Sequence, residues 1–330
     1  RTITDFNIIP KETKKIVIGM SGGKDAAIMT HFLMEYQKEE RPDIKLDMLI
    51  APTPYPLWND IPDKIFNTAI NSTQKDLLIE QKKVIDNFLE YWSQYMECKV
   101  IPVEYELIED RILKMYWSCM MCFNTKMKAF NDYFLKEAHE DNTLFACGWT
   151  KWDSHYTLLS HLLKSDGSKW YEVKEKNPKK YKADCIYLAS FSAYTKVDLG
   201  IPGKKIYRIN PMVEFDDSET FALSRELEIP VVEDICAKLY GDIFEQDRRK
   251  ISKYLEIFSN NQKHLNLSEN TMLYSYRTLL KFMQDIELIP PLEEIESLVY
   301  DAYNSNFEEI FNLLKKQKIR ERIAIDYGQK

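Results

Sequence analysis

The stretch IVIGMSGGKDAAIM, residues 16–29, decides the fold because its character changes twice within a few residues. It opens as a run of apolar, β-branched residues, which is typical of a short buried strand. Ser21, Gly22 and Gly23 then break the run, and Lys24 begins a segment of small and apolar residues that predicts a helix. A strand, a glycine turn and a helix in direct succession are the usual opening of a parallel α/β sheet.

The same alternation of strands and helices continues along the chain. We expect strands at 14–20, 45–51, 98–105, 142–149 and 205–212, and helices at 24–38, 73–97 and 124–140. Connecting helices of this length predict an α/β fold with a doubly wound, mainly parallel five-stranded sheet that is covered on both faces. Ligands bind such sheets at the carboxyl ends of the strands, so the turn after the first strand is the expected site.

Two later regions differ from this pattern. Residues 164–184 are rich in lysine and poor in apolar residues, so we expect an insertion or mobile loop there rather than core. From residue 218 the pattern is helical to the end. We therefore divide the chain into an α/β domain, residues 1–217, and a helical C-terminal region, residues 218–330, which contributes Cys236. The apolar faces of its last helices suit a homodimer as well as an internal core.

Composition limits the class of protein. The 330 residues are 45% hydrophobic, which is the content of a globular protein with a sizeable core. Stretches of about 18 apolar residues are absent and the polar start is no signal peptide, so we expect a cytoplasmic protein away from membranes. A net charge of −7 argues against coating nucleic acid through bulk charge but permits a local basic patch. Six cysteines are too few for a disulfide scaffold, which favours metal or redox chemistry.

The turn at Ser21, Gly22 and Gly23 has the properties of a phosphate site. Glycines let consecutive backbone N–H groups face a ligand, and the helix N-terminus adds partial positive charge. The spacing is neither that of a Walker A loop nor that of a G-x-G-x-x-G fingerprint. An ordinary strand-to-helix turn is the alternative, but the following Lys24 and Asp25 favour phosphate binding.

This segment resembles the signature S-G-G-x-D-S of the PP-loop ATP pyrophosphatase superfamily, with Ala26 in place of the final serine. The resemblance implies that ATP and Mg²⁺ bind at the loop and that ATP is split between its α and β phosphates. A carbonyl oxygen of the substrate would attack the α-phosphorus and pyrophosphate would leave. Lys24 would neutralise phosphate charge, and Asp25 would hold Mg²⁺ or orient the loop.

Cys119 and Cys122 form a C-x-x-C pair at the start of a predicted helix, a spacing that lets both thiolates reach one metal or cluster. Two ligands do not complete a site. A pair of semi-buried thiols is one alternative, and zinc, which takes four ligands, is another. We expect Cys147 and Cys185 to be core or loop residues.

Within the superfamily, residues 14–240 most resemble the tRNA 2-thiolation enzymes of the TtcA and TtuA type. The motifs that carry the resemblance are CMMCFNTKMKAFNDYF, ACGWTKWDSHYTLLSHLL, INPMVEFDDSETFAL and EIPVVEDIC. They imply ATP contacts at Gly148 and Asp153, the latter also catalytic, and a third cysteine at Cys236. In that family three cysteines hold a [4Fe-4S] cluster whose open iron carries the sulfur that displaces AMP. The two histidines that follow the family's glycine are Trp149 and Thr150 here.

The resemblance implies a tRNA base or a smaller carbonyl compound as the substrate, with sulfide or a carrier protein as the sulfur donor. A basic, aromatic-rich stretch suits RNA, although solvated surface explains it equally well. Its residues are Lys169, Lys174, Lys176, Lys179, Lys180 and Lys182 with Trp170, Tyr171 and Tyr181. Two alternatives remain: a cluster-free PP-loop enzyme, either an amide-forming ligase or similar to sulfonucleotide reductases, and a non-catalytic nucleotide- or RNA-binding protein, which Ala26 favours.

Overall fold

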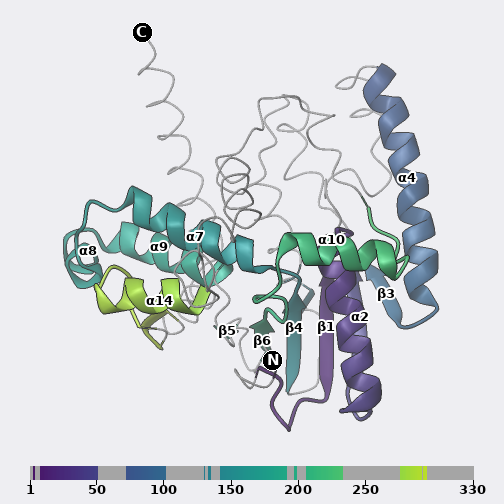
Figure 1. Cartoon of the computed structure of the whole chain (residues 1–330), viewed down its shortest axis with the longest axis horizontal. Helices are drawn as coiled ribbons and strands as arrows, with labels where there is room; N and C mark the ends of the chain where they lie inside the picture. Colours follow the sequence, from purple (N-terminus) through teal and green to yellow (C-terminus); the bar gives the residue numbers. More distant parts are fainter. Residues whose placement is uncertain are drawn as a thin grey trace, which may run out of the picture.

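The computed structural model forms one sheet with helices around it (Figure 1). It describes residues 3, 8–50, 72–101, 130, 133–134, 142–191, 197–198, 206–232, 276–291 and 293–295. The sheet has the order β3-β2-β1-β4-β6-β5. Its strands are β1 (Lys15–Met20), β2 (Lys45–Ile50), β3 (Glu97–Val100), β4 (Thr143–Cys147), β5 (Val197–Asp198) and β6 (Ile206–Ile209).

Five of these strands, β3, β2, β1, β4 and β6, are mutually parallel. The predicted doubly wound, mainly parallel five-stranded sheet is therefore confirmed. The two-residue β5 pairs antiparallel with β6 and extends the edge of the sheet. A strand of two residues is too short to leave a periodic pattern in the sequence.

The strand order reverses at β1, which lies between β2 and β4. The chain leaves β1 through α2 (Lys24–Glu39) and returns as β2 on one side, whereas β4 pairs with the other side of β1. In doubly wound sheets this reversal opens a crevice at the carboxyl ends of the two central strands. The loop 21–23 after β1 and Gly148 after β4 come to the same edge.

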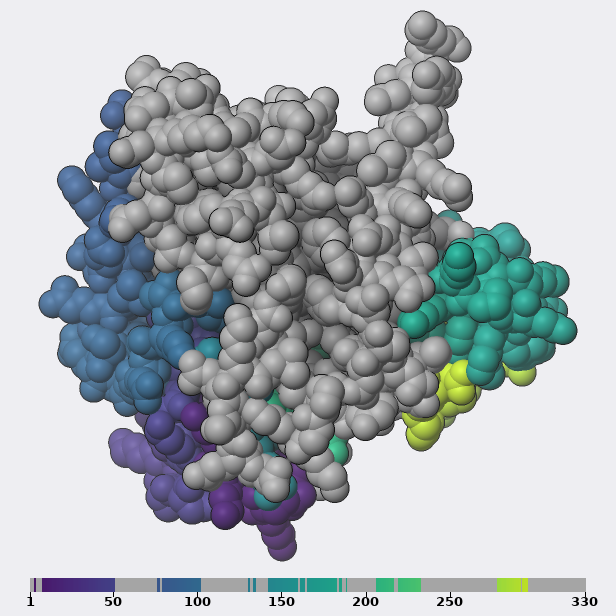
Figure 2. Space-filling view, turned by 180° about the vertical axis from the view of Figure 1, so that it is seen from behind, coloured from purple at the N-terminus to yellow at the C-terminus, as the bar shows by residue number. Residues whose placement is uncertain are grey.

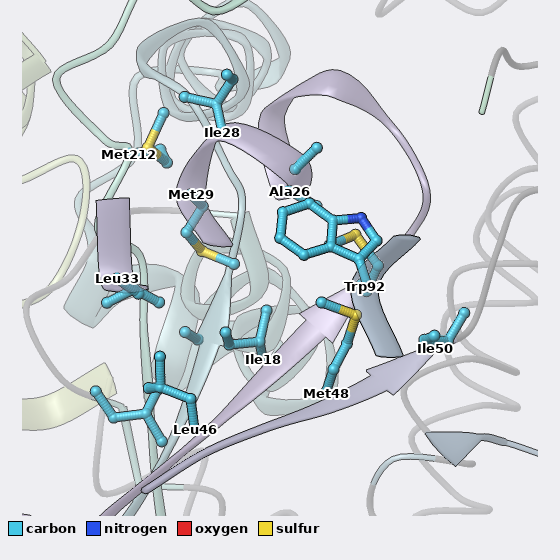
Figure 3. Close-up of a cluster of buried hydrophobic side chains, with 14 of the residues drawn as sticks. Ile18, Ala26, Ile28, Met29, Leu33, Leu46, Met48, Ile50, Trp92 and Met212 are labelled. Carbon is cyan, nitrogen blue, oxygen red and sulfur yellow. The ribbon is translucent and has the colours of Figure 1, made fainter. Parts of the chain in front are cut away.

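The main core lies between one face of the sheet and helices α2 and α4 (Ser72–Ser93) (Figure 3). Alternate residues of neighbouring strands, such as Ile18 and its register partner Met48, point to this face because side chains alternate along a strand. Trp92 of α4 covers them and is almost fully buried. The other face is also covered, because the Phe145 ring packs 4.8 Å from Phe130 between ring centroids.

A second core joins helices α7 (Lys151–Lys164), α9 (Pro178–Phe191) and α14 (Tyr276–Asp285) through side chains such as Leu158, Leu188 and Met283. This helical group, together with the short α8 (Trp170–Lys176), lies at the opposite side of the molecule from α4 (Figures 1 and 2). None of the helices in the described ranges is long and apolar enough to cross a membrane.

The expectation of a mobile loop at 164–184 is wrong, because most of this segment forms α8 and the first half of α9. Lysine and glutamate are good helix formers, and a few apolar side chains suffice to dock such a helix. Here Tyr181 and Cys185 are buried. The helix predicted at 124–140 lies almost entirely outside the described residues. The division of the chain at residue 217 stays a prediction, although α10 (Asp217–Glu226) packs beside α2.

Candidate nucleotide-binding site

The turn after β1 has the backbone geometry of an anion site. Gly22 has a φ of +86°, in the left-handed region where a side chain would be strained. Gly23 caps α2 in an extended conformation, and its N–H donates to Ser21 Oγ over 3.4 Å. The first N–H groups of a helix have no partner within it, so α2 turns backbone donors and its positive dipole end toward this edge. This is the geometry that phosphate binding requires.

Lys24 and Asp25, the two charged residues expected at the site, are in direct contact. Lys24 Nζ lies 2.6 Å from Asp25 Oδ1. The ammonium also donates to Thr220 Oγ1 over 3.0 Å, and the same hydroxyl donates to Asp25 Oδ1 over 2.6 Å. Thr220 belongs to α10 and is completely buried. Sequence reasoning missed this residue although it lies within the motif INPMVEFDDSETFAL, because 195 positions separate it from Asp25 and the motif itself does not indicate the contact.

Gly148 is required by close packing after β4. A Cβ placed on it would lie 2.7 Å from both the N and the Cα of Ala26 and 3.0 Å from the carbonyl carbon of Asp25. These are backbone atoms that cannot turn aside as a side chain can. Ala26 itself is buried, and its carbonyl accepts a 2.7 Å hydrogen bond from Thr30. The glycine predicted at the site therefore seats the first turn of α2 against the end of β4.

Asp153 lies at the start of α7, where it has a structural task. The N–H of Thr150, the residue before the helix, donates to Asp153 Oδ2 over 3.1 Å in a capping box. A contact of Asp153 with ATP stays a prediction.

Trp149 lies directly before this cap. Its ring covers the guanidinium of Arg208 on β6, with the guanidinium carbon 4.8 Å from the ring centroid.

A buried ion pair joins the starts of α7 and α10. Lys151 Nζ lies 3.3 Å from Asp216 Oδ2, and both side chains are almost fully enclosed. The Lys151 N–H also donates to the carbonyl of Phe215 over 3.0 Å. A cation in the first turn opposes the helix dipole, so the nearby carboxylate offsets an otherwise unfavourable charge. The pair fixes the approach of α10, and with it Thr220, to the edge of the sheet.

The three cysteines expected to bind the cluster, Cys119, Cys122 and Cys236, lie outside the described residues. In the parts of the chain that the structure describes, no three histidine, cysteine or acidic side chains gather into a metal site. Cys147 and Cys185, which we expected to be core or loop residues, are buried and belong to the core. Burial raises the pKa of each of their thiols to about 12.

The remaining described cysteine, Cys98, is half-buried, and burial raises the pKa of its thiol to about 11. Thiols with such pKa values stay protonated near neutral pH, whereas metal binding and nucleophilic attack need the thiolate.

The segment after α10 returns to the glycine turn after β1. The N–H of Val232 donates to the carbonyl of Gly22 over 2.7 Å. This bond ties the left-handed glycine to a segment more than 200 positions later in the chain. It also brings the chain that leads toward Cys236 to the edge where Lys24 and Asp25 lie.

One of three comparisons with known proteins found a match, and it concerns the fold. Neither a protein-family model nor a curated protein matches the chain. A solved structure does: the U34-tRNA thiolase NcsA from Methanococcus maripaludis with its [4Fe-4S] cluster, at 17% identity and a TM-score of 0.54 over 88% of this chain and 78% of the thiolase. This chain shares the fold of that thiolase. The fold implied by the resemblance to PP-loop tRNA thiolation enzymes is thereby confirmed.

Proposed function

We propose that this protein is an ATP-dependent sulfurtransferase of the PP-loop class. It adenylates a carbonyl oxygen of its substrate, releases pyrophosphate and replaces AMP by sulfur. The observation that carries the proposal is the loop after β1, where a left-handed Gly22, a helix N-terminus and a charged pair at Lys24 and Asp25 lie at the switch point of the sheet. Backbone donors and one cation at such a point suit the phosphates of a nucleotide.

The residues of the loop have different roles in binding and cleaving ATP. Backbone N–H groups of residues 22–25 bind phosphate oxygens, and Lys24 offsets charge that develops on the leaving pyrophosphate. Asp25 orients the ammonium, as it does in the present structure, or holds Mg²⁺ through its second oxygen. The bond from the substrate oxygen to the α-phosphorus forms while the bond from that phosphorus to pyrophosphate breaks.

Cys119, Cys122 and Cys236 would hold a [4Fe-4S] cluster. Two observations fit this donor set. Cys236 comes four positions after Val232, which is bonded to the loop, and four extended residues span at most about 14 Å. The thiols of Cys98, Cys147 and Cys185 have raised pKa values and are poor ligands. When bound, such a cluster supplies sulfur close to the activated carbon, where proximity favours transfer.

The substrate proposed is a tRNA base with a carbonyl oxygen next to a ring nitrogen. The support is the similar structure, whose name assigns it to U34 of tRNA. The overall charge of −7 requires that tRNA contact a local surface rather than the whole protein. A smaller carbonyl compound as the true substrate is one outcome of the test below.

The test is the content of iron, acid-labile sulfide and zinc in protein purified without oxygen. We expect roughly four irons per chain in the wild type, loss of iron in Cys236→Ala, and unchanged iron in the matched control Cys185→Ala, whose thiol is buried. Zinc or no metal in the wild type would contradict the cluster and favour a cluster-free PP-loop enzyme. Thiolation of unmodified tRNA or of a small carbonyl compound, with sulfide and ATP, then identifies the substrate class.

A further inference from the structure

We infer that Thr220 is a positioning residue of the nucleotide site and that its hydroxyl fixes Lys24 and Asp25 for phosphate binding. The inference rests on the proposed function and adds a residue from α10 to a site otherwise built by the loop. Ala26 has no hydroxyl of its own, and the Thr220 hydroxyl that contacts the charged pair comes from a residue 195 positions after Asp25.

The contacts of the Thr220 hydroxyl use both of its chemical capacities. A hydroxyl has one O–H to donate and two lone pairs to accept with. Thr220 donates to Asp25 Oδ1 over 2.6 Å and accepts from Lys24 Nζ over 3.0 Å. Each bond has an ionised partner, which makes it stronger than a bond between neutral groups.

Thr220 is more deeply buried than Lys24 and Asp25, the two residues that its hydroxyl contacts. Thr220 is 0% exposed, whereas the Lys24 and Asp25 side chains keep 26% and 28% of their surface open to solvent. The hydroxyl therefore lies behind the pair, and the charged groups remain reachable at the edge of the sheet. This arrangement suits a ligand that arrives from solvent and meets a lysine already held in place.

The helix that carries Thr220 is itself fixed. Asp216 at its start pairs with Lys151, and its N–H donates to Glu219 Oε2 over 2.7 Å. The Thr220 N–H donates to the Asp216 carbonyl over 3.1 Å. A long lysine side chain loses rotamer freedom when it binds a phosphate, and a rigid acceptor lowers that cost by limiting the freedom beforehand.

The same helix provides a matched control. Ser224, one turn after Thr220, is also buried, and its hydroxyl donates to the Phe221 carbonyl over 3.0 Å, within α10. Ser224→Ala thus removes a buried hydroxyl from α10 without removing the contact to the loop. Thr220→Val removes the loop contact and keeps the side-chain shape, and Thr220→Ser keeps the hydroxyl.

The experiment is calorimetric titration of the full chain with Mg-ATP and with pyrophosphate, alongside thermal melting. We expect Thr220→Val to weaken Mg-ATP binding about tenfold, which corresponds to about 1.4 kcal/mol. Thr220→Ser and Ser224→Ala should stay within about twofold of the wild type, by the same scale. In a Lys24→Met background the effect of Thr220→Val should shrink, because one of the two contacts of the hydroxyl is with the ammonium.

Four outcomes would overturn the inference. Equal affinity of the wild type and Thr220→Val would do so and leave the proposed function intact. So would equal losses in Thr220→Val and Ser224→Ala, which would indicate a general weakening of α10, or an unchanged effect of Thr220→Val in the Lys24→Met background. A wild type that binds neither Mg-ATP nor pyrophosphate would overturn the proposed function as well. If Thr220→Val does not fold, Thr220→Ala replaces it in the same comparison.

Discussion

The edge around Gly22, Lys24, Asp25 and Thr220 and the helical group of α7, α8, α9 and α14 use charge in different ways. At the edge, a cation and an anion from the loop are held from behind by a distant hydroxyl and stay partly open to solvent. In the helical group, Lys169 donates to the Ile286 carbonyl and pairs with Glu287. The first arrangement leaves charge available to a ligand, whereas the second uses it to fasten α8 to the end of α14.

Two aromatic residues of the helical group, like its charged residues, are used for packing. Trp170 stacks on Tyr181, and the Tyr181 hydroxyl donates to Glu294 over 3.0 Å. Burial raises the pKa of Tyr181, so this hydroxyl remains a donor at physiological pH. Two of the three aromatic side chains that the sequence suggested for RNA stacking, Trp170 and Tyr181, are thus engaged in packing, whereas Tyr171 is exposed. A variant that tests one region should therefore change a contact in that region and leave the contacts of the other region intact.

The largest effect is expected at the buried ion pair of Lys151 and Asp216. Lys151→Met keeps an unbranched side chain of nearly the same length but removes the ammonium that faces the Asp216 carboxylate. Removing one partner of a buried pair leaves an uncompensated charge, so the free energy of unfolding should fall by about 3–5 kcal/mol. Urea titration measures this change. A loss below about 1 kcal/mol, the size expected of a surface pair, would contradict the account of this contact.

A smaller effect is expected from Gly148→Ala. The added Cβ meets the backbone of Ala26 at 2.7 Å, so the free energy of unfolding should fall by about 1–3 kcal/mol. Mg-ATP affinity should fall as well, because the first turn of α2 must shift.

Gly167→Ala in the helical group is the control for Gly148→Ala. Its φ of +83° imposes strain, but no atom lies within 4 Å of an added Cβ. Its cost should be about 1–2 kcal/mol and should leave Mg-ATP affinity unchanged. Equal losses of Mg-ATP affinity in both glycine variants would contradict the account, because Gly148→Ala would then have no effect specific to the nucleotide site.

The smallest effect is expected from Lys174→Met, which breaks the pair with Glu294 at the surface of the helical group. Both side chains keep contact with solvent, so the loss should be below about 1 kcal/mol at neutral pH. The Lys174 ammonium lowers the pKa of Glu294 in the folded state. The pair therefore stabilises the fold above the unfolded pKa of about 4.3.

This stabilisation should disappear as the pH falls through the folded pKa of Glu294. Thermal melts of the wild type and Lys174→Met between neutral and acidic pH test this. A difference between the two proteins that grows toward acidic pH would contradict it.

The sequence was sufficient for features set by local pattern and insufficient for those set by contact between distant segments. Five parallel strands, α2 and the glycine turn follow from hydrophobic runs, glycine positions and helix signals within short windows. Thr220 and the Lys151–Asp216 pair could not be found this way, because each contact depends on how α10 approaches the sheet. The prediction for residues 164–184 was wrong because we took a high lysine content as a sign of a solvated loop. Helix propensity and a few buried side chains instead give two helices there.

The measurement that tests the central claim most directly is the identity of the products formed from ATP. The full chain, prepared without oxygen, is incubated with Mg-ATP, sulfide and unmodified tRNA, and the nucleotides are separated by chromatography. A phosphate loop that activates a carbonyl oxygen yields AMP and pyrophosphate in equal amounts, and Lys24→Met should suppress both. ADP and phosphate as products, or ATP that remains intact while wild type and Lys24→Met behave alike, would contradict the account.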